Sequence, residues 1–286
     1  MANETGLDDR SVRRAFERAA GRYDELGVLQ KEIGSRLFAR LEYIKLQPRS
    51  VLDLGAGTGY FTAELMRRYK KSQVVAADFA LPMLHQAGKR RAGLFRKPGL
   101  VCADAGSLPF TDESFDLVFS NLMLQWCQPI EKYFAELRRV IRPDGLLLFS
   151  SFGPDTLQEL RQAWREADDA VHVHEFQDMH DVGDALLQAG FAEPVMDMEM
   201  LTLTYRQLKD LLLDLKGVGA AYAAADRSRG LLGKQRYAAM EAAYERFRNQ
   251  ESRLPASYEV VYGHAWAPPV SASVLPEKTF QIKPEN

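Results

Sequence analysis

The sequence predicts an α/β fold in which a mostly parallel sheet is covered by helices on both faces. Short apolar runs alternate with helical patterns from residue 50 to residue 152, as expected for repeated β-α units. The chain has 286 residues, 46% hydrophobic and 27% charged, which is enough for a large core of ordinary composition. Two further strand-like runs follow residue 152, so the predicted sheet has seven strands.

The first part of the chain, residues 10–45, has a helical pattern because Leu29, Ile33, Leu37 and Leu41 recur at intervals of four. Five strands are then predicted in order: "SVLDL", "QVVAAD", "GLVCAD", "FDLVFSN" and "LLLFSSF". The helix "PIEKYFAELRRVI" precedes the fifth strand, and the breaker "RPDG" at residues 142–145 is expected to end it.

The pattern changes after residue 152. Two helices, "DTLQELRQAWREA" and "DMHDVGDALLQAGF", precede an alternating strand, "EPVMDMEMLTLTY". Residues 205–250 are helical and charged, with a break near Gly217 and Gly219, and "SYEVVYGHAW" is the last strand. We therefore expect N-terminal helices over 1–48, a core over 49–204, a helical insertion over 205–254, the last strand over 255–268 and a loose tail over 269–286.

A glycine-rich turn follows the first strand, in "SVLDLGAGTGYFTAELM". Asp53 lies in an apolar strand, where an acid is costly, and Gly55, Ala56, Gly57 and Gly59 follow it. Such a turn lies at the carboxyl edge of the sheet, where α/β sheets bind ligands, and glycine lets a ligand approach the backbone closely. The spacing D-x-G-x-G-x-G differs from the dinucleotide fingerprint G-x-G-x-x-G. An acid there repels a pyrophosphate but favours an ammonium or sulfonium group, and S-adenosylmethionine carries both.

The next two predicted strands also end in acids. Asp78 is placed to accept hydrogen bonds from ribose hydroxyls, and Asp104 from the adenine amino group, with the Ala105 backbone beside it. Phe79 and Met83 are candidates for apolar cover of the adenine ring. Taken singly, the glycine turn could be a tight connection, Asp78 a helix cap and Asp104 a turn residue. Three acids at three successive strand ends favour the cofactor site.

With these motifs, residues 50–152 resemble the class I S-adenosylmethionine-dependent methyltransferases, which implies a Rossmann-like sheet. Segments over a wider range, about residues 10–268, are similar to the malonyl-acyl-carrier-protein O-methyltransferases of biotin synthesis. These segments are "VRRAFERAAGRYDELGVLQ", "SNLMLQWC", "SSFGPDTLQEL", "FQDMHDVGDALLQAGFAEPVMDME", "LLLDLKGVGA" and "YEVVYGHAW". The resemblance implies methyl transfer from S-adenosylmethionine to the free carboxylate of a malonyl thioester on acyl carrier protein. A carboxylate with a pKa near ~4 is already ionised at neutral pH, so no general base and no metal are expected.

The resemblance leaves alternatives. The family is also similar to the mitochondrial complex I assembly factor that hydroxylates an arginine. An arginine hydroxylase of that kind, a cofactor-binding assembly protein and a methyltransferase for another small carboxylate therefore stay open, although the closing "GHAW" favours the biotin enzyme. Malonyl-coenzyme A is a further possible substrate beside the malonyl carrier protein.

The resemblance and the order of the strands suggest further site residues. Tyr23 matches a family position that closes over cofactor and substrate, with a core tyrosine as the alternative. Asn121 follows the fourth strand and is expected to face the methionine part of the cofactor or to serve a turn. Gln125 and Trp126 are expected to wall the reaction pocket, although Trp126 could equally belong to the core. His264, near the end of the last strand, is either a substrate contact or a core histidine.

Among the basic residues of the insertion at 205–250, six are candidates for recognising an acidic carrier protein, with a solvated helix face as the alternative. They are Lys209, Lys216, Arg227, Arg229, Lys234 and Arg236. Arg227 and Arg229, in the polar connection "AADRSRG", are the preferred candidates, either for docking or for binding the malonyl carboxylate. The histidines of "HVHEF" and His180 are not expected to bind a metal, because no cysteine is near them in sequence and the chemistry needs none.

Charge and hydropathy argue against two classes of partner. A formal net charge of −2 gives no bulk attraction to nucleic acid or anionic membranes. No apolar run approaches the ~20 residues of a membrane span, and the first residues lack an apolar signal region. Cys102 and Cys127 form no motif spacing and are expected to be packed thiols in a reducing compartment. The expected location is the cytoplasm.

Overall fold

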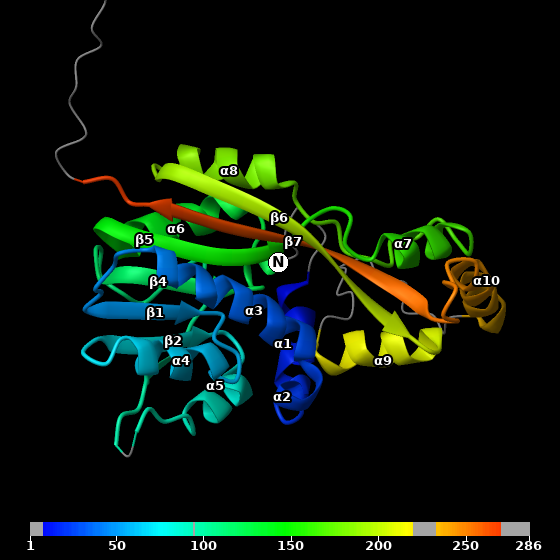
Figure 1. Ribbon diagram of the computed structural model, residues 1–286, viewed down its shortest axis with the longest axis horizontal. Coiled ribbons are helices and arrows are strands. Elements are labelled where there is room, and N and C mark those ends of the chain that lie inside the picture. Colours follow the sequence, from blue (N-terminus) through cyan, green and yellow to red (C-terminus); the bar gives the residue numbers. More distant parts are fainter. Residues whose placement is uncertain (1–7, 94, 220–232, 270–286) are drawn as a thin grey trace, which may run out of the picture.

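The computed structural model describes residues 8–93, 95–219 and 233–269. Its centre is a seven-stranded sheet with the strand order β3-β2-β1-β4-β5-β7-β6 (Figure 1). The strands are β1 (Ser50–Leu54), β2 (Gln73–Asp78), β3 (Gly99–Cys102), β4 (Phe115–Asn121), β5 (Ile141–Phe152), β6 (Ala192–Tyr205) and β7 (Leu254–Trp266). β1 to β5 pair in parallel, whereas β7 is antiparallel to both β5 and β6. The predicted mostly parallel α/β sheet is confirmed.

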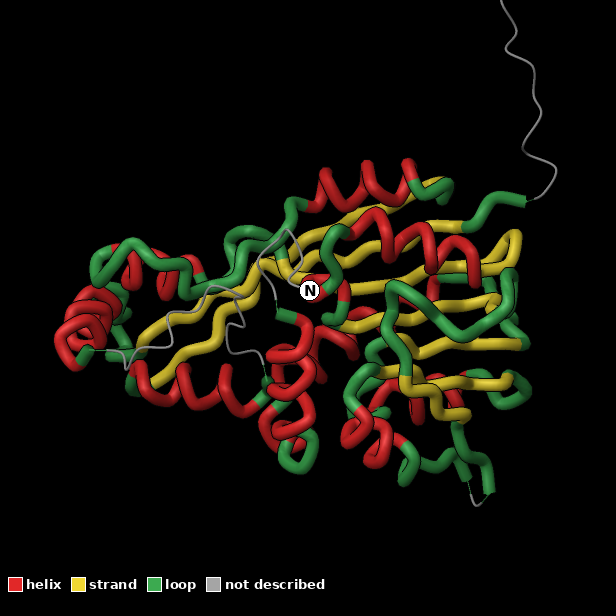
Figure 2. The backbone as a smooth tube through the Cα atoms, turned by 180° about the vertical axis from the view of Figure 1, so that it is seen from behind, coloured by secondary structure: helices red, strands yellow, loops and turns green. Residues whose placement is uncertain are grey.

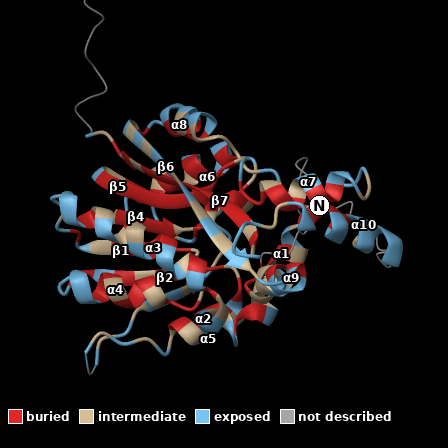
Figure 3. Ribbon diagram, turned by 45° about the vertical axis from the view of Figure 1, so that its right-hand side comes forward, coloured by how far each residue is buried: buried red, intermediate tan, exposed pale blue. Residues whose placement is uncertain are grey.

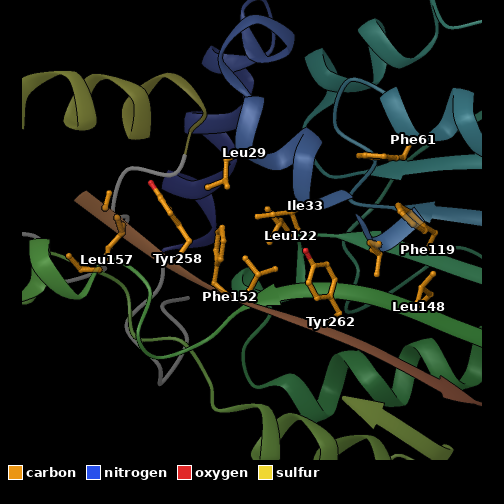
Figure 4. Close-up of a cluster of buried hydrophobic side chains, with 14 of the residues drawn as sticks. Leu29, Ile33, Phe61, Phe119, Leu122, Leu148, Phe152, Leu157, Tyr258 and Tyr262 are labelled. Atoms are coloured by element: carbon orange, nitrogen blue, oxygen red, sulfur yellow. The ribbon is translucent and has the colours of Figure 1, made fainter. Parts of the chain in front are cut away.

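Helices cover both faces of the sheet because successive residues of a strand point to opposite sides. On β5, Leu146 and Leu148 belong to one apolar cluster, while Leu147 and Phe149 belong to the other. The covering helices are α3 (Val28–Arg40) and α4 (Tyr60–Arg68) on the first cluster, and α6 (Ile130–Val140) and α8 (Met179–Gln188) on the second. Figure 4 shows part of the first cluster, and Figure 3 shows β5 and β7 buried along most of their length.

The N-terminal helical region, expected as helices over residues 1–48, consists of separate helices. Its parts are α1 (Asp9–Ala19), α2 (Tyr23–Leu26), α3 and a 3-10 turn (Leu41–Tyr43). The Gly27 N–H donates to the Tyr23 carbonyl at 2.7 Å and ends α2. A Cβ at Gly27 would lie 2.8 Å from that same oxygen, so a glycine is required for this close turn.

The breaker "RPDG" also behaves differently from the expectation. Helix α6 does end before it, at Val140, but the four residues lie inside the long strand β5. The pairing of β4 with β5 jumps from Phe115–Ile141 to Leu117–Leu146, so the segment forms a bulge. Asp144 takes a positive φ of 62° in this bulge.

An arm projects beyond the carboxyl edge of the parallel strands. β5 ends at Phe152, paired with Val260, whereas the β6–β7 hairpin continues to the pair Tyr205–Leu254. Three helices gather around this extension: α7 (Gln158–Arg165), α9 (Leu208–Gly217) and α10 (Lys234–Glu245) (Figures 1 and 2). Two of them belong to the insertion that the sequence places between the last two strands. None of the helices in the described ranges is long and apolar enough to span a membrane.

The end of α9 packs on the N-terminal helices through two glycines. A Cβ at Gly217 would lie 2.5 Å from Leu26 Cδ1, and one at Gly219 would lie 3.1 Å from Phe16 Cδ1. These glycines, which the sequence suggested only as a helix break, therefore allow close approach between the arm and α1–α2. The result is a helical layer over the carboxyl edge of the sheet.

Candidate active site

The turn after β1 uses its three glycines in different ways. Gly55, Gly57 and Gly59 have φ values of 71°, 53° and 75°, in the left-handed region that favours glycine. A Cβ at Gly55 would lie 2.5 Å from Met123 Cγ, and one at Gly59 would lie 2.7 Å from Ala87 Cβ. Packing therefore requires these two glycines. A Cβ at Gly57 would meet only the Tyr23 ring, at 4.0 Å, so a ligand can approach the backbone there.

Asp78 holds this turn against the end of β2. One carboxylate oxygen accepts the Gly57 N–H at 2.9 Å, and the other accepts the Ala80 N–H at 2.8 Å. Burial raises the pKa of this carboxyl, while these backbone bonds act in the opposite direction. The carboxylate thus holds local backbone before α5 (Leu81–Ala87) but does not cap that helix, whose N-cap is Ala80, and carboxylate oxygens have further lone pairs for a ligand.

Asp53 lies beneath the turn and is only 2% exposed. The Thr62 hydroxyl donates to it. Burial raises the pKa of Asp53 to about 7; the Thr62 bond opposes this rise and the nearby Asp78 charge adds to it. A cationic ligand at the turn would favour the ionised form of this acid.

The residues expected around the adenine ring lie between β2, β3 and α1. Met83 is buried in a small apolar cluster with Ala19, the last residue of α1, and with Ala20. Phe79 packs edge-to-face on Phe16 of α1, with ring centroids 6.1 Å apart. Asp104 is exposed after β3. Its carboxylate accepts the Gly106 N–H at 2.8 Å, so it already serves a local turn.

Tyr23 begins α2 and lies over the glycine turn. Its ring packs on the α1 cluster of Ala19 and Ala20, and it is the atom group nearest to the open face of Gly57. Burial raises the pKa of the Tyr23 phenol well above its usual range, and the charges of Asp78 and Asp24 act in the same direction. The hydroxyl therefore stays neutral at physiological pH. The ring thus packs against the N-terminal helical region, and the closing of Tyr23 over cofactor and substrate stays a prediction.

Asn121 connects α3 to the sheet. Its Nδ2 donates to the Gln30 carbonyl at 3.0 Å, and its Oδ1 accepts the Ser150 hydroxyl at 2.8 Å. The amide therefore fixes α3 above the carboxyl edge instead of presenting a free group to a ligand, which differs from the role expected from the sequence.

Gln30 is a candidate that the sequence motifs did not indicate. Its Oε1 is buried and has no hydrogen-bond partner among the described residues. This oxygen lies 3.6 Å from the position that a Cβ at Gly27 would take, a position that is also 3.5 Å from Tyr23 Cε1. A buried carbonyl oxygen that lacks a donor suits an ammonium group. Gln30 is the last residue of the segment "VRRAFERAAGRYDELGVLQ", but nothing in that pattern distinguishes it, so only its environment reveals it.

Gln125 and Trp126 lie in a short 3-10 turn (Leu124–Trp126) after β4. The Gln125 Nε2 donates to the Leu122 carbonyl at 2.7 Å, while its Oε1 is buried without a partner in the described part of the chain. Trp126 contacts Phe16 at 5.6 Å between centroids and stacks on His174 at 6.1 Å. Both residues therefore lie at the carboxyl edge, after β4, and their role as a pocket wall stays a prediction.

The histidines near residue 174 have protein partners. His174 bonds to the Gln125 carbonyl, His172 to Asp168 and His180 to Asp178. Within the residues that the structure describes, no group of three potential metal ligands is found.

His264 lies away from the edge of the sheet at which the sequence predicts a substrate contact. Because β7 is antiparallel to β5, its last residues lie at the opposite edge of the sheet from the glycine turn. His264 pairs with Leu148 and Val195 in mid-sheet, and burial lowers its pKa, with Arg40 acting in the same direction. The expected substrate contact is therefore wrong. Arg227 and Arg229 lie outside the described residues.

Comparison with known proteins supports the interpretation of the glycine turn. Residues 52–149 match the family model described as a methyltransferase domain. The chain is similar to a malonyl-[acyl-carrier protein] O-methyltransferase of Halorhodospira halophila, with 53% identity covering 91% of this chain and 88% of that one. It is also similar to proteins of the same name from Gallionella capsiferriformans, at 49% identity over 93% of each chain, and from Legionella pneumophila, at 45% over 89% of each.

Solved structures are similar in fold. The YcgJ protein of Bacillus subtilis matches with a TM-score of 0.55 at 20% identity, covering 81% of this chain and 97% of that one. The [4+2]-cyclase SpnF matches with a TM-score of 0.51 at 17% identity, covering 82% of each chain. A cyclase on this sheet shows that the fold alone does not decide the reaction.

Proposed function

Because the chain belongs to the malonyl-[acyl-carrier protein] O-methyltransferase family, we propose that it methylates the free carboxylate of a malonyl thioester on acyl carrier protein, an early step of biotin synthesis. The family membership rests on identities of 43–53% to relatives over about nine-tenths of the chain, and it confirms the resemblance inferred from the sequence. This identity is the observation that carries the proposal, and it favours the ester-forming enzyme over the arginine hydroxylase and the assembly protein.

The site residues fit S-adenosylmethionine. The open face of Gly57 admits a ligand to the backbone, and the Asp78 carboxylate beside it keeps lone pairs for ribose hydroxyls. The unpartnered Gln30 oxygen suits the ammonium group, and the buried Asp53 favours positive charge nearby. When bound, S-adenosylmethionine supplies the methyl group: a carboxylate oxygen of the substrate takes it up, and the electron pair of the broken carbon–sulfur bond stays on sulfur.

The protein has little acid–base chemistry to perform. The substrate carboxylate is ionised before the reaction, so no proton moves. The remaining tasks are to align the reacting atoms and to exclude water, and positioning alone can supply ~7–11 kcal/mol. Tyr23 at the turn and the contact of α9 with α1–α2 provide cover over the carboxyl edge.

Carrier protein is the proposed form of the substrate because the arm offers exposed basic residues to an acidic partner. Lys209 and Lys216 lie on α9, and Lys234 and Arg236 lie on α10; all four are exposed. Malonyl-coenzyme A lacks the protein surface that these residues would contact.

The test is direct. The protein is incubated with S-adenosylmethionine labelled in the methyl group and with malonyl carrier protein, and the product is examined for a methyl ester that base removes. Label in a base-labile ester on the carrier is the expected result. Acetyl carrier protein, which has no free carboxylate, is the matched control. Absence of ester formation in a folded protein that binds S-adenosylmethionine would refute the proposal.

A further inference from the structure

Arg161, on α7, is a partly buried cation that no acid neutralises. Its Nη1 donates to the Pro154 carbonyl at 2.7 Å, and its Nη2 donates to the Thr156 carbonyl at 3.0 Å. Its Nε is buried and has no hydrogen-bond partner among the described residues. No carboxylate of the described residues lies within ion-pair distance of it, whereas Arg139 is paired with Asp112 and Glu136.

This arrangement is unfavourable without an anion. Carbonyl groups orient a guanidinium but do not cancel its charge, and a buried charge is normally paired. Burial lowers the pKa of Arg161, and the nearby Arg165 charge acts in the same direction. The more distant acids Glu175 and Asp155 oppose this effect without reaching the guanidinium. A carboxylate ligand would satisfy both the charge and the unpaired N–H.

The loop before α7 is held against β7 by hydrogen bonds and close packing. The Asp155 N–H donates to the buried carboxylate of Glu259 at 2.7 Å, and the Leu157 N–H donates to the Ser257 carbonyl at 2.6 Å. A Cβ at Gly153 would lie 2.4 Å from the Glu259 carboxyl carbon, so the loop is closely packed on β7. The two carbonyls that orient the guanidinium are therefore fixed before any ligand binds.

Arg161 also lies on the cofactor side of the sheet. Its loop begins where β5 ends, at the same carboxyl edge as the glycine turn. Its charge acts on His174, which bonds to the Gln125 carbonyl and stacks on Trp126. A continuous series of ring contacts joins the two regions: Phe79–Phe16, Phe16–Trp126, Trp126–His174, His174–Phe176 and Phe176–Phe152. Figure 4 shows Phe152, the last member of this series, with Tyr258 and Leu157.

We propose that Arg161 binds the free carboxylate of the malonyl group through its Nε–H and a remaining Nη–H. The inference rests on the proposed function and names the residue that recognises its substrate. A fork of two parallel N–H groups matches the two oxygens of a carboxylate. The methyl ester that forms has lost the negative charge, so Arg161 holds the substrate more tightly than the product, which favours product release.

The experiment measures binding, with S-adenosylhomocysteine present to prevent turnover. Affinities for malonyl and acetyl carrier protein are measured for the wild type, Arg161→Gln, Arg161→Lys and Arg165→Gln. Arg165 is exposed on the same helix, so its variant matches the change in net charge. The wild type should prefer malonyl by about 10-fold to 100-fold, the loss expected for a charge-assisted contact. Arg161→Gln should abolish this preference, and Arg165→Gln should keep it.

The outcomes are distinguishable. A wild type that does not prefer malonyl over acetyl would overturn the inference, whereas absence of ester formation in the labelling test above would contradict the proposed function. A wild-type preference that persists in a folded Arg161→Gln would overturn the inference and leave the proposed function intact. Where circular dichroism shows that the glutamine variant does not fold, Arg161→Lys decides, because it keeps the charge and loses the planar fork. A reduced preference with unchanged S-adenosylhomocysteine affinity supports the inference, and an unchanged preference overturns it.

Discussion

Asp53→Asn should make the stability of the ligand-free protein less dependent on pH. Asp53 is buried beneath the glycine turn, and burial raises its pKa from the ordinary 3.8 to about 7. Between these values the folded state holds a proton that the unfolded chain has lost. The contribution to stability is therefore greatest at low pH and disappears as the pH rises through about 7. Asparagine has no such titration.

The ordinary pKa of Asp53, 3.8, and its folded-state value of about 7 set the size of the change in unfolding free energy. The free energy of unfolding of the wild type should fall by about 2.5 kcal/mol between pH 5 and pH 8 through this group alone. Asp53→Asn lacks this pH-dependent contribution to the free energy of unfolding. Asparagine introduces a buried N–H pair whose cost does not depend on pH, so that cost cancels when the wild type and the variant are compared at both pH values.

Urea unfolding followed by circular dichroism at pH 5, 6, 7 and 8 measures the effect. Asp169→Asn serves as the control because this aspartate is exposed. The stability of Asp53→Asn relative to the wild type should rise by about 2.5 kcal/mol from pH 5 to pH 8, and that of the control should stay constant. Equal pH dependence in the wild type and Asp53→Asn would show that Asp53 does not titrate as a buried acid, and the reasoning would fail.

Three further predictions concern the turn, the chemistry and the carrier. Gly57→Val should lower S-adenosylmethionine affinity at least ~10-fold, because the open backbone face is filled, and valine at this positive φ should also cost about 1–3 kcal/mol of stability. Gly59→Ala, whose Cβ would lie 2.7 Å from Ala87 Cβ, should cost a similar amount of stability with a smaller loss of affinity; calorimetry and urea unfolding measure the two effects separately. Single-turnover methyl transfer should be nearly flat between about pH 6 and 8, and a steep rise would indicate a nucleophile other than a carboxylate. Lys209→Glu with Lys216→Glu should raise the KM for malonyl carrier protein and flatten its salt dependence, and an equal effect on malonyl-coenzyme A would argue against carrier docking.

The sequence alone predicted the parts of the site that depend on local order along the chain. The alternation of strands and helices and the spacing of Asp53, the glycines and Asp78 are properties of a few neighbouring residues, so they can be read from the chain. Parallel strands bring their carboxyl ends to one edge, and this topology alone places the Asp53 turn beside Asp78, where the Gly57 N–H reaches its carboxylate.

Tertiary structure decided what depends on strand direction and on long-range contacts. His264 lies near the end of a predicted strand, as Asp78 does, but β7 runs antiparallel, and this reverses the edge at which its end lies. No sequence pattern indicated that the Asn121 side chain has a partner on α3. In the structure it donates to the carbonyl of Gln30, which lies 91 residues away in the chain. Arg161 resembles any surface arginine of an amphipathic helix, and only the packed loop after β5 shows that its charge is buried and without an acid. Burial and partner choice arise from residues far apart in the chain, so no local pattern encodes them.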